Sequence, residues 1–331
     1  MIPATVYAVV VPPLLAFIVS SALIAVILRS RVAALTLDHP NERSLHAVAV
    51  PRTGGIGIVA GIAAACVYLQ PAGDPWLWLA LALLIAVSLV DDLRGVRVAW
   101  RLLMHVAGAV VAATVLLGDH AWWLMVVAAL AIAWMINLYN FMDGADGLAG
   151  GMAVIGFGSY GVAALAGGDI TFAAVNLSIA TAALGFLFFN FPPARIFMGD
   201  AGAIPLGFLA AVVDIAGCLR GDWPWWLGLV IFSPFIVDAS ITLMKRLLRG
   251  TRVWQAHREH YYQRLVQSGW GHRKTAYAEY ALMLPCSALA LLGMRQSFGV
   301  QMAILFSVAI FYAGLAIALE RHFFHTAASD A

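Results

Sequence analysis

Residues 75–97 read PWLWLALALLIAVSLVDDLRGVR, an apolar run that leads into two adjacent aspartates and two arginines. A helix that crosses a lipid bilayer needs about 17–25 mostly apolar residues. The apolar part, residues 75–90, is slightly shorter than this, so we expect its helix to continue into the aspartates. The stretch therefore predicts a membrane-spanning helix that carries carboxylates at one end.

The composition of the whole chain agrees with a membrane protein. Of 331 residues, 63% are hydrophobic and 11% are charged, with a mean hydropathy of +0.90 and a net charge of +2. Soluble domains carry roughly a quarter charged residues, and nucleic-acid binding needs a strong basic field. These values exclude a soluble enzyme, a disordered protein and a nucleic-acid binder. The three cysteines lie in apolar stretches without C-x-x-C spacing, which predicts buried thiols rather than disulfides or a zinc site.

Similar apolar runs recur along the chain and predict an all-α, polytopic integral membrane protein with about eleven transmembrane helices. The spans are expected near residues 3–28, 53–70, 75–90, 102–117, 121–139, 148–166, 171–189, 203–219, 224–243, 276–292 and 299–319. No linker or separate soluble segment interrupts them, so residues 1–331 are interpreted as a single domain. The first span lacks a basic leader and is too long for a signal peptide, which favours an uncleaved helix.

The distribution of basic residues predicts the orientation of these spans. With this topology, 17 of the 19 lysines and arginines fall on the side that also carries all the long loops. Positively charged loops remain in the cytoplasm. We therefore expect cytoplasmic long loops, an external N-terminus and a cytoplasmic C-terminus.

Five carboxylates gather on the same predicted face, from three different loops: Asp91, Asp92, Asp143, Asp146 and Asp200. Clustered oxygens suit Mg²⁺, which takes one or two carboxylates together with substrate phosphates. Asp143 and Asp146 would share a face if their segment were helical. The alternative is that Asp and Gly simply form turns at helix ends. Five carboxylates on one face favour an active site on the cytoplasmic loops.

The largest basic loop contains WQAHREHYYQRL at residues 254–265, in which His257 and His260 flank Arg258. Arginine and histidine beside a carboxylate cluster suit a diphosphate, which arginine can bind through two hydrogen bonds. The alternative is a juxtamembrane basic segment attracted to anionic lipid head groups. Both interpretations can hold together.

Three further features have competing interpretations. Residues 55–60, GIGIVA, match a dinucleotide-binding fingerprint but begin a membrane span, which favours close helix packing through small residues. Asp214 and Asp238 lie within predicted spans, where an ionisable group is functional by default. Each can belong to a proton path or cap a neighbouring helix.

Taken in order, the motifs resemble those of the polyprenyl-phosphate N-acetylaminosugar-1-phosphate transferases, the MraY/WecA superfamily or glycosyltransferase family 4. The matching segments are DHPNERSLH (38–46), PRTGG (51–55), the Asp91–Asp92 pair, NFMDGADGLA (140–149), NFPPARIFMGDAG (190–202), PFIVD (234–238) and the histidine loop. Each motif alone is weak, but their order and their shared predicted face make the resemblance specific. It covers most of the chain.

The resemblance implies a role for each candidate site residue. Asp200 would coordinate Mg²⁺, with Mn²⁺ as an alternative ion and Asp91 as a second candidate ligand, and Asp91, Asp92 and Asp200 would be catalytic. A nucleotide pocket would be formed by Asn140, Asp143, Asp146, Asn190 and Phe197. Phe197 would stack on uracil, and the diphosphate would be held by His257, Arg258 and His260.

The implied activity is transfer of a sugar 1-phosphate from a UDP-N-acetylaminosugar to polyprenyl (undecaprenyl) phosphate, with release of UMP. Many family members carry three clustered histidines where this chain has HREHYY, which resembles the initiators of O-antigen and lipopolysaccharide synthesis. The expected location is the bacterial inner membrane, with membrane lipid as a partner and a homodimer as an open possibility. The alternatives are a phospho-N-acetylmuramoyl-pentapeptide transferase, a secondary transporter or a non-catalytic membrane scaffold.

Overall fold

The computed structural model describes residues 4–40, 45–46, 48–252, 255 and 257–329, and most of these residues are helical. The long helices are α1 (Ala4–Arg29), α3 (Gly54–Leu69), α4 (Pro75–Arg94), α5 (Val98–Leu117), α6 (Trp122–Phe141), α7 (Leu148–Gly167), α8 (Ile170–Asn190), α9 (Asp200–Arg220), α11 (Ser233–Leu248), α13 (Gly271–Gly293) and α14 (Phe298–Ser329). The short elements are α2 (Val32–Leu35), β1 (Leu37–Asp38), β2 (Val50–Pro51), α10 (Leu227–Ile231), α12 (Tyr261–Leu265) and a π-helical turn, η1 (Val266–Trp270).

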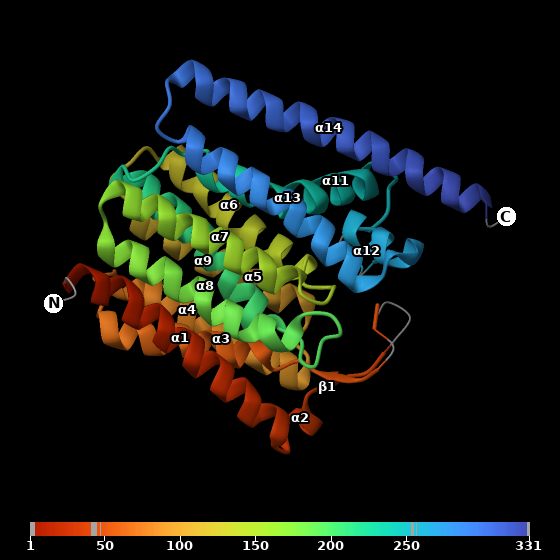
Figure 1. Cartoon of the computed structure of the whole chain (residues 1–331), viewed down its shortest axis with the longest axis horizontal. Helices are drawn as coiled ribbons and strands as arrows, with labels where there is room; N and C mark the ends of the chain where they lie inside the picture. Colours follow the sequence, from red (N-terminus) through yellow and green to blue (C-terminus); the bar gives the residue numbers. More distant parts are fainter. Residues whose placement is uncertain (1–3, 41–44, 47, 253–254, 256, 330–331) are drawn as a thin grey trace.

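The long helices lie side by side in one bundle, as Figure 1 shows. Within the described residues, nine helical segments are long and apolar enough to cross a membrane, and α3 is a shorter apolar helix. The prediction of an all-α, polytopic membrane protein is confirmed. The short turns after α3, α5, α7, α9 and α13 lie at one end of the bundle, and the long loops predicted for one side lie at the other end. We call this second end the site end.

The expected continuous span near residues 224–243 is interrupted in the structure. It is divided into α10 and α11 at Phe232, whose φ and ψ angles of −91° and 8° leave the helical pattern. Pro234 follows within the first turn of α11. Because proline lacks an N–H donor and restricts the preceding residue, it favours a helix start over helix continuation. The interruption directs α11 as a separate helix toward the site end, where it continues to Leu248.

The centre of the bundle is formed by α7, α8 and α9. Of the residues in the most apolar 18-residue stretch of each helix, 72%, 61% and 61% are buried. Close packing of small residues joins α3 to α9. A Cβ atom added at Gly55 would lie only 2.2 Å from the backbone nitrogen of Gly202. The interpretation of residues 55–60 as a packing stripe, and not a dinucleotide fingerprint, is therefore confirmed.

The two intramembrane aspartates each cap a neighbouring helix. Asp214 accepts a hydrogen bond of 3.1 Å from the N–H of Gly228 in α10. Asp238 accepts bonds of 2.9 and 3.0 Å from the N–H groups of Tyr261 and Tyr262, which begin α12. Such bonds satisfy the orphan donors at a helix start. Of the two interpretations drawn from sequence, the structure therefore provides direct contacts for capping.

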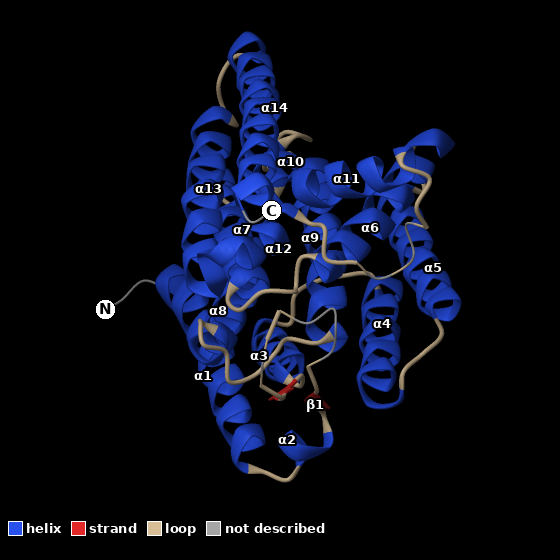
Figure 2. Cartoon of the chain, turned by 90° about the vertical axis from the view of Figure 1, so that its right-hand side faces the viewer, coloured by secondary structure: helices blue, strands red, loops and turns tan. Residues whose placement is uncertain are grey.

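Backbone hydrogen bonds tie the loops together at the site end, which faces the viewer in Figure 2. The strands β1 and β2 pair antiparallel and close the segment between α2 and α3. The N–H of Phe197 donates to Pro51 at 2.7 Å, and the N–H groups of Gly54 and Gly55 donate to Phe197 and Met198. The PRTGG segment thus anchors the loop that leads into α9.

Candidate active site

Four of the five predicted carboxylates converge at the site end. Asp91 and Asp92 occupy the last turn of α4, Asp200 is the first residue of α9, and Asp143 lies in the loop between α6 and α7. The fifth, Asp146, is directed elsewhere. Residues 142–147 form turns and not a helix, so the condition under which Asp143 and Asp146 would share a helical face is not met.

A single arginine joins the carboxylates of α4 and α9. The Nη1 atom of Arg101 lies 2.6 Å from Oδ2 of Asp91 and 3.2 Å from Oδ2 of Asp200. The side chains of Asp91 and Asp200 are also within hydrogen-bonding reach of each other. Arg101 comes from the first turn of α5, because the short loop after α4 returns the chain directly to this end.

Asp92 fixes the start of α9. Its two carboxylate oxygens accept hydrogen bonds from the N–H groups of Asp200 and Ala201, at 3.1 and 2.9 Å. Gly199 precedes this turn with a φ of +70°, and a Cβ there would lie 2.8 Å from Asp92 and 2.5 Å from the carbonyl of Arg52. Only glycine fits this approach. The carboxylate of Asp92 therefore sets the position of Asp200.

A cavity of about 310 Å³ opens beside these carboxylates, and we call it the Phe197 cavity. Its functional lining comes from four parts of the chain and comprises Asp38, His46, Arg52, Asn140, Asp143, Asn190, Phe197 and Asp200. The rings of His46 and Phe197 meet edge to face, with centroids 4.9 Å apart. A flat aromatic ring beside amides and carboxylates can accommodate a planar, hydrogen-bonding ligand.

Asp143 lines the Phe197 cavity and is buried close to two other carboxylates. Burial raises its pKa well above the ordinary value, and the neighbouring carboxylates of Asp200 and Asp92 raise it further. Both causes act against the charged form. A bound cation or a hydrogen-bond donor would relieve this repulsion.

The side chains of two predicted pocket residues hold neighbouring loops in place through hydrogen bonds to their backbone. Asp146 accepts a hydrogen bond from the N–H of Ala194 at 2.9 Å and lies 3.2 Å from His272. Asn190 accepts from the N–H of Gly147 and donates to the carbonyl of Ile196, both at 2.8 Å. Asn190 still lines the Phe197 cavity, whereas Asp146 is absent from its lining.

A second, larger cavity of about 850 Å³ lies between α5, α6 and α11, and we call it the His257 cavity. Its polar side chains include Arg101, His105, Asn137, Asn140, His257 and His260. The rest of its wall is largely apolar, from Val98, Leu102, Leu130, Ala133, Trp134, Phe141 and Leu243. Asn140 lines both cavities, and Arg101 links the wall of this cavity to Asp200 in the other.

The two histidines of the basic loop face this cavity together. Their ring centroids are 4.8 Å apart, and His260 also stacks against Phe141. The pKa of His257 is lowered to about 4, chiefly by burial and further by His260 and by the guanidinium of Arg246. His257 is therefore neutral near pH 7.

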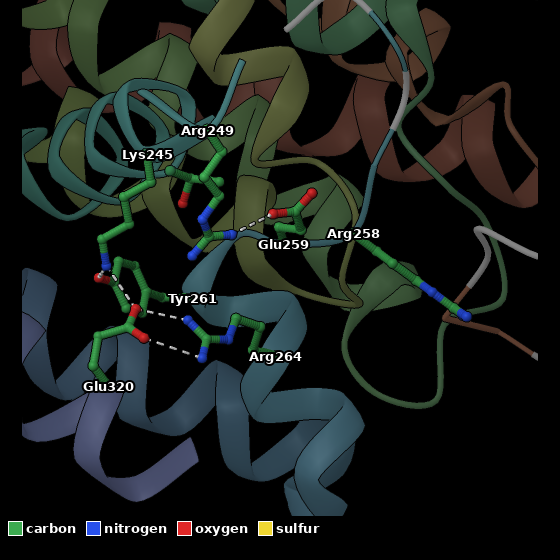
Figure 3. A pocket seen from close by; sticks show the side chains of 8 residues that line it. Lys245, Arg249, Arg258, Glu259, Tyr261, Arg264 and Glu320 are labelled. Atoms are coloured by element: carbon green, nitrogen blue, oxygen red, sulfur yellow. Dashed lines mark hydrogen bonds and ion pairs between the residues drawn. The ribbon is translucent and has the colours of Figure 1, made fainter. Parts of the chain in front are cut away.

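Arg258 is separated from these histidines. It contributes to a third cavity, beside α11 and α14, and in Figure 3 its side chain points away from Glu259 and Arg264. Other parts of the predicted motifs, residues 41–44 and residues 254 and 256, lie outside the described residues. The structure thus brings His257 and His260 together and leaves Arg258 outside their cavity.

The acidic pair Asp91 and Asp200 is the best candidate for holding a metal ion. Among the described residues, no group of three or more His, Cys, Asp or Glu side chains has the arrangement of a complete metal site. Mg²⁺ needs fewer protein ligands when substrate phosphates complete its shell. Asp200 Oδ2 is buried and, although Arg101 is close, accepts no well-directed hydrogen bond. This unsatisfied oxygen fits a hard cation.

Several site residues were missed by sequence reasoning: Asp38, His46, Arg52, Arg101, His105, Asn137 and His272. Asp38, His46 and Arg52 lie within the quoted motifs, so their position there was a usable signal. The signal for Arg101 was weaker. Arg101 lies in the first turn of the helix that follows Asp91 and Asp92, and sequence reasoning used its charge only to predict the topology. His272 gave no local signal, since its partners are distant in sequence.

Comparison with known proteins gives matches over much of the chain. Residues 75–218 match the family model described as Glycosyl transferase family 4. This region contains α4 to α9 almost completely, and with them Asp91, Asp92, Asp143 and Asp200.

Three similar proteins carry names of one reaction type. A probable undecaprenyl-phosphate N-acetylglucosaminyl 1-phosphate transferase of Bacillus subtilis (strain 168) is 27% identical over 83% of this chain and 82% of its own length. A decaprenyl-phosphate N-acetylglucosaminephosphotransferase of Mycobacterium tuberculosis (strain CDC 1551 / Oshkosh) is 28% identical over 76% of this chain and 74% of its own. A phospho-N-acetylmuramoyl-pentapeptide-transferase of Lacticaseibacillus paracasei is 28% identical over 66% of this chain and 76% of its own.

Proposed function

We propose that this chain, which belongs to the glycosyl transferase family 4 superfamily, transfers a sugar 1-phosphate from a UDP-N-acetylaminosugar to a polyprenyl phosphate and releases UMP. The observation that carries the proposal is the meeting of two cavities of different chemistry at one cluster of carboxylates. The Phe197 cavity is polar with an aromatic face, and the His257 cavity combines apolar walls with histidines. One suits a nucleotide and the other a phosphorylated lipid.

In this proposal the Phe197 cavity binds the donor. The exposed face of Phe197 stacks on uracil, and Asn140 and Asp143 supply polar groups for the base and ribose. Arg52 is the one arginine or lysine in the described lining, and it can pair with a donor phosphate. Asn190 and Asp146 act indirectly, by holding the loops of this cavity in place.

The His257 cavity binds the acceptor. Leu102 and Leu130, two of its apolar lining residues, are 49% and 67% exposed along α5 and α6, so a prenyl chain can enter from the lipid. Its phosphate is then directed toward Arg101, His257 and His260. This assignment shifts the two histidines from the donor diphosphate toward the point where both substrates meet.

Mg²⁺ would be held by Asp200, with Asp91 as a second ligand and Mn²⁺ as an alternative ion. When bound, it would neutralise the donor diphosphate and stabilise the charge that develops on UMP. The unsatisfied Oδ2 of Asp200 supports this location. Asp92 holds the backbone of Asp200 and so maintains the ligand geometry.

Transfer itself needs one displacement at phosphorus. An oxygen of the acceptor phosphate forms a bond to the sugar-linked phosphorus, the bond from that phosphorus to the bridging oxygen breaks, and UMP leaves with that oxygen. A phosphate monoester is largely ionised near neutral pH, because its second pKa is about 6. Asp91 and Arg101 therefore position the acceptor, and Asp91 is not needed as a base. A covalent aspartyl intermediate would remove no evident barrier.

The donor favoured by the relatives is UDP-N-acetylglucosamine, because the relatives named for this sugar cover more of the chain than the muramoyl-pentapeptide relative described above. The product would be a polyprenyl-diphosphate-linked sugar that initiates a cell-envelope polysaccharide of the O-antigen type. With the long loops in the cytoplasm, the reaction would occur at the inner face of the bacterial cytoplasmic membrane.

The test is a donor panel with the purified full-length protein. UMP release is measured with undecaprenyl phosphate, Mg²⁺ and either UDP-N-acetylglucosamine, UDP-N-acetylgalactosamine or UDP-N-acetylmuramoyl-pentapeptide. We expect release that needs both the lipid and Mg²⁺ and is fastest with UDP-N-acetylglucosamine. The Asp200→Asn variant, which keeps the side-chain volume, should lose it while remaining monodisperse. UMP release from the muramoyl donor alone would show that the proposed donor is wrong. UMP release that does not depend on the lipid with any donor would reject the proposal.

A further inference from the structure

We infer that a basic pocket between α11, α12 and α14 binds the phosphate of an anionic phospholipid. The pocket has a volume of about 270 Å³ and is shown in Figure 3. It shares no lining residue with the Phe197 cavity or the His257 cavity. It is therefore a separate site, and we call it the α14 pocket.

The α14 pocket carries an excess of positive charge. The charged residues in its lining are Lys245, Arg249, Arg258, Arg264, Glu259 and Glu320. Because the side chain of Arg258 points away from the others, the side chains that converge in the pocket carry a net charge of +1. Glu259 is also paired with the buried Arg246, which stands behind the lining. An anion that enters the pocket therefore meets cations in excess over the carboxylates within it.

Glu320 shows that the donors in this pocket are arranged for an oxyanion. The ammonium of Lys245 lies 2.6 Å from one oxygen of Glu320, and Arg264 donates to both oxygens, at 2.7 and 3.3 Å. Figure 3 shows Lys245 and Arg264 converging on this carboxylate from two elements. A two-point arginine contact supported by a lysine is the pattern that binds phosphate as well as carboxylate.

Arg249 leaves donor capacity for an anion from outside. Its side chain is 61% exposed, and its contact with Glu259 is long, at 3.4 Å. Glu259 has a closer partner in Arg246. Arg249 can therefore turn to a bound phosphate without leaving a carboxylate unpaired.

The surroundings of the pocket favour a lipid over a soluble phosphate. Leu247 and Leu248, the last two residues of α11 directly before Arg249, are 60% and 79% exposed. Phe324 is 74% exposed and lies one turn beyond Glu320 on α14. Basic groups at the end of a spanning helix, flanked by exposed apolar side chains, match a phospholipid with its head group at the interface and its chains in the bilayer.

The experiment is native mass spectrometry of the detergent-solubilised full-length protein with dioleoylphosphatidylglycerol or dioleoylphosphatidylcholine. Since each basic residue near a lipid head group contributes about 1 kcal/mol, the net charge of +1 predicts that the first bound lipid is the anionic one by about fivefold. Arg249→Gln should reduce this preference about fivefold. Arg321→Gln is the matched control, because it removes an exposed cation from the same end of α14 outside the pocket lining.

Further measurements distinguish a phospholipid head group from a soluble phosphate ion and from general charge attraction. Millimolar inorganic phosphate should not displace phosphatidylglycerol, and displacement would show a site for soluble anions. Equal loss of preference in Arg249→Gln and Arg321→Gln would show general charge attraction. Either result, or equal binding of the two lipids by the wild type, overturns the inference. Lys245→Gln should abolish the preference, and if it does not purify, Arg249→Gln decides alone because its side chain is exposed and its partner retains Arg246.

Discussion

At the scale of single residues, one guanidinium connects the catalytic candidates. Arg101 contacts Asp91 and Asp200 and also lines the His257 cavity. Two carboxylates held this close would repel each other without a cation between them. The same guanidinium is therefore suited both to fixing the acidic pair and to meeting an incoming phosphate.

Arg101→Met should lower kcat for UMP release by about 10²–10³-fold, the usual effect of removing one preorganised donor from a transition state. Arg97→Met, an exposed arginine one turn earlier, is the matched control and should retain activity. Both variants are compared by steady-state kinetics after size-exclusion chromatography. Equal rates in the two variants would remove Arg101 from the proposed active site.

His272 acts on the Phe197 cavity from behind its wall. The N–H of Asp146 donates to its Nδ1 atom at 3.1 Å, and its Nε2 atom lies 3.0 Å from the carbonyl oxygen of Leu45. The same Nδ1 atom also lies 3.2 Å from a carboxylate oxygen of Asp146, so the ring contacts both the backbone and the side chain of that residue. His272 thus links the loop after α6 to the segment that carries His46.

His272→Ala should raise the KM for the UDP-sugar by up to about 30-fold, since it removes two hydrogen bonds worth about 1 kcal/mol each. The kcat should change little, because no reacting atom is near His272. His272→Gln, which keeps a donor and an acceptor, should recover part of the affinity. A fall in kcat at constant KM would instead place His272 in the chemical step.

The protonation of His257 gives a pH prediction. Its pKa is about 4 in the folded protein and 6.5 in an unfolded chain. Between these values the unfolded chain binds the proton and the folded one does not, so the free energy of unfolding falls as pH falls from 6.5 toward 4. The thermal midpoint should therefore drop less in His257→Gln than in wild type between these pH values. His120→Gln, an exposed histidine at the opposite end, should behave as wild type, and an identical drop in all three proteins would refute the assignment.

At the scale of elements, the start of α9 is the part on which the site depends most. Asp92 caps it, Gly199 allows the close approach, and the PRTGG segment holds the loop before it. The packing of α3 on α9 supports all three contacts. A site built on a helix start in this way needs tight helix packing behind it.

Gly55→Ala tests this packing. The added methyl group would lie 2.2 Å from the backbone of Gly202, which cannot move as a flexible side chain could. We expect a loss of about 1–3 kcal/mol in the free energy of unfolding and a lower thermal midpoint. Gly158→Ala in α7 is the control, because nothing lies within 4 Å of its added methyl group. Its midpoint should be unchanged or higher, and equal midpoints in the two variants would contradict close α3–α9 packing.

Most helix positions could be predicted from the sequence, because each membrane-spanning helix corresponds to one continuous run of apolar residues. The span expected at 148–166 is the helix Leu148–Gly167, and that at 121–139 is Trp122–Phe141. The interruption at Phe232 was missed because the apolar run continues through it. Pro234 indicates a helix start, but the continuous hydropathy of the run favoured a single span.

The candidate site was predictable only in part. Its carboxylates carry motif signals, but the difference between Asp143 and Asp146 depends on the turn that separates them. Arg101 and His272 acquire their positions only when α5 and α13 pack against distant loops. Such pairings have no local pattern in the sequence.

At the scale of the whole molecule, the bundle separates functions by position. Its short turns occupy one end, and the other end holds both cavities, the acidic cluster and the α14 pocket. The His257 cavity is bordered by exposed apolar residues of α5 and α6, whereas the Phe197 cavity is formed by loops and by the ends of α6, α8 and α9. A donor from water and an acceptor from lipid can therefore reach the same carboxylates from different directions.

The measurement that tests this account most directly is the fate of the sugar-linked phosphorus. Purified protein is incubated with Mg²⁺, undecaprenyl phosphate and UDP-N-acetylglucosamine carrying ³²P in the β-phosphate, and the lipid and aqueous phases are counted separately. Transfer of a sugar 1-phosphate predicts that the label enters the lipid while unlabelled UMP is released, and that Asp200→Asn does neither. Release of labelled UDP with an unlabelled glycolipid would show sugar transfer alone and contradict the account.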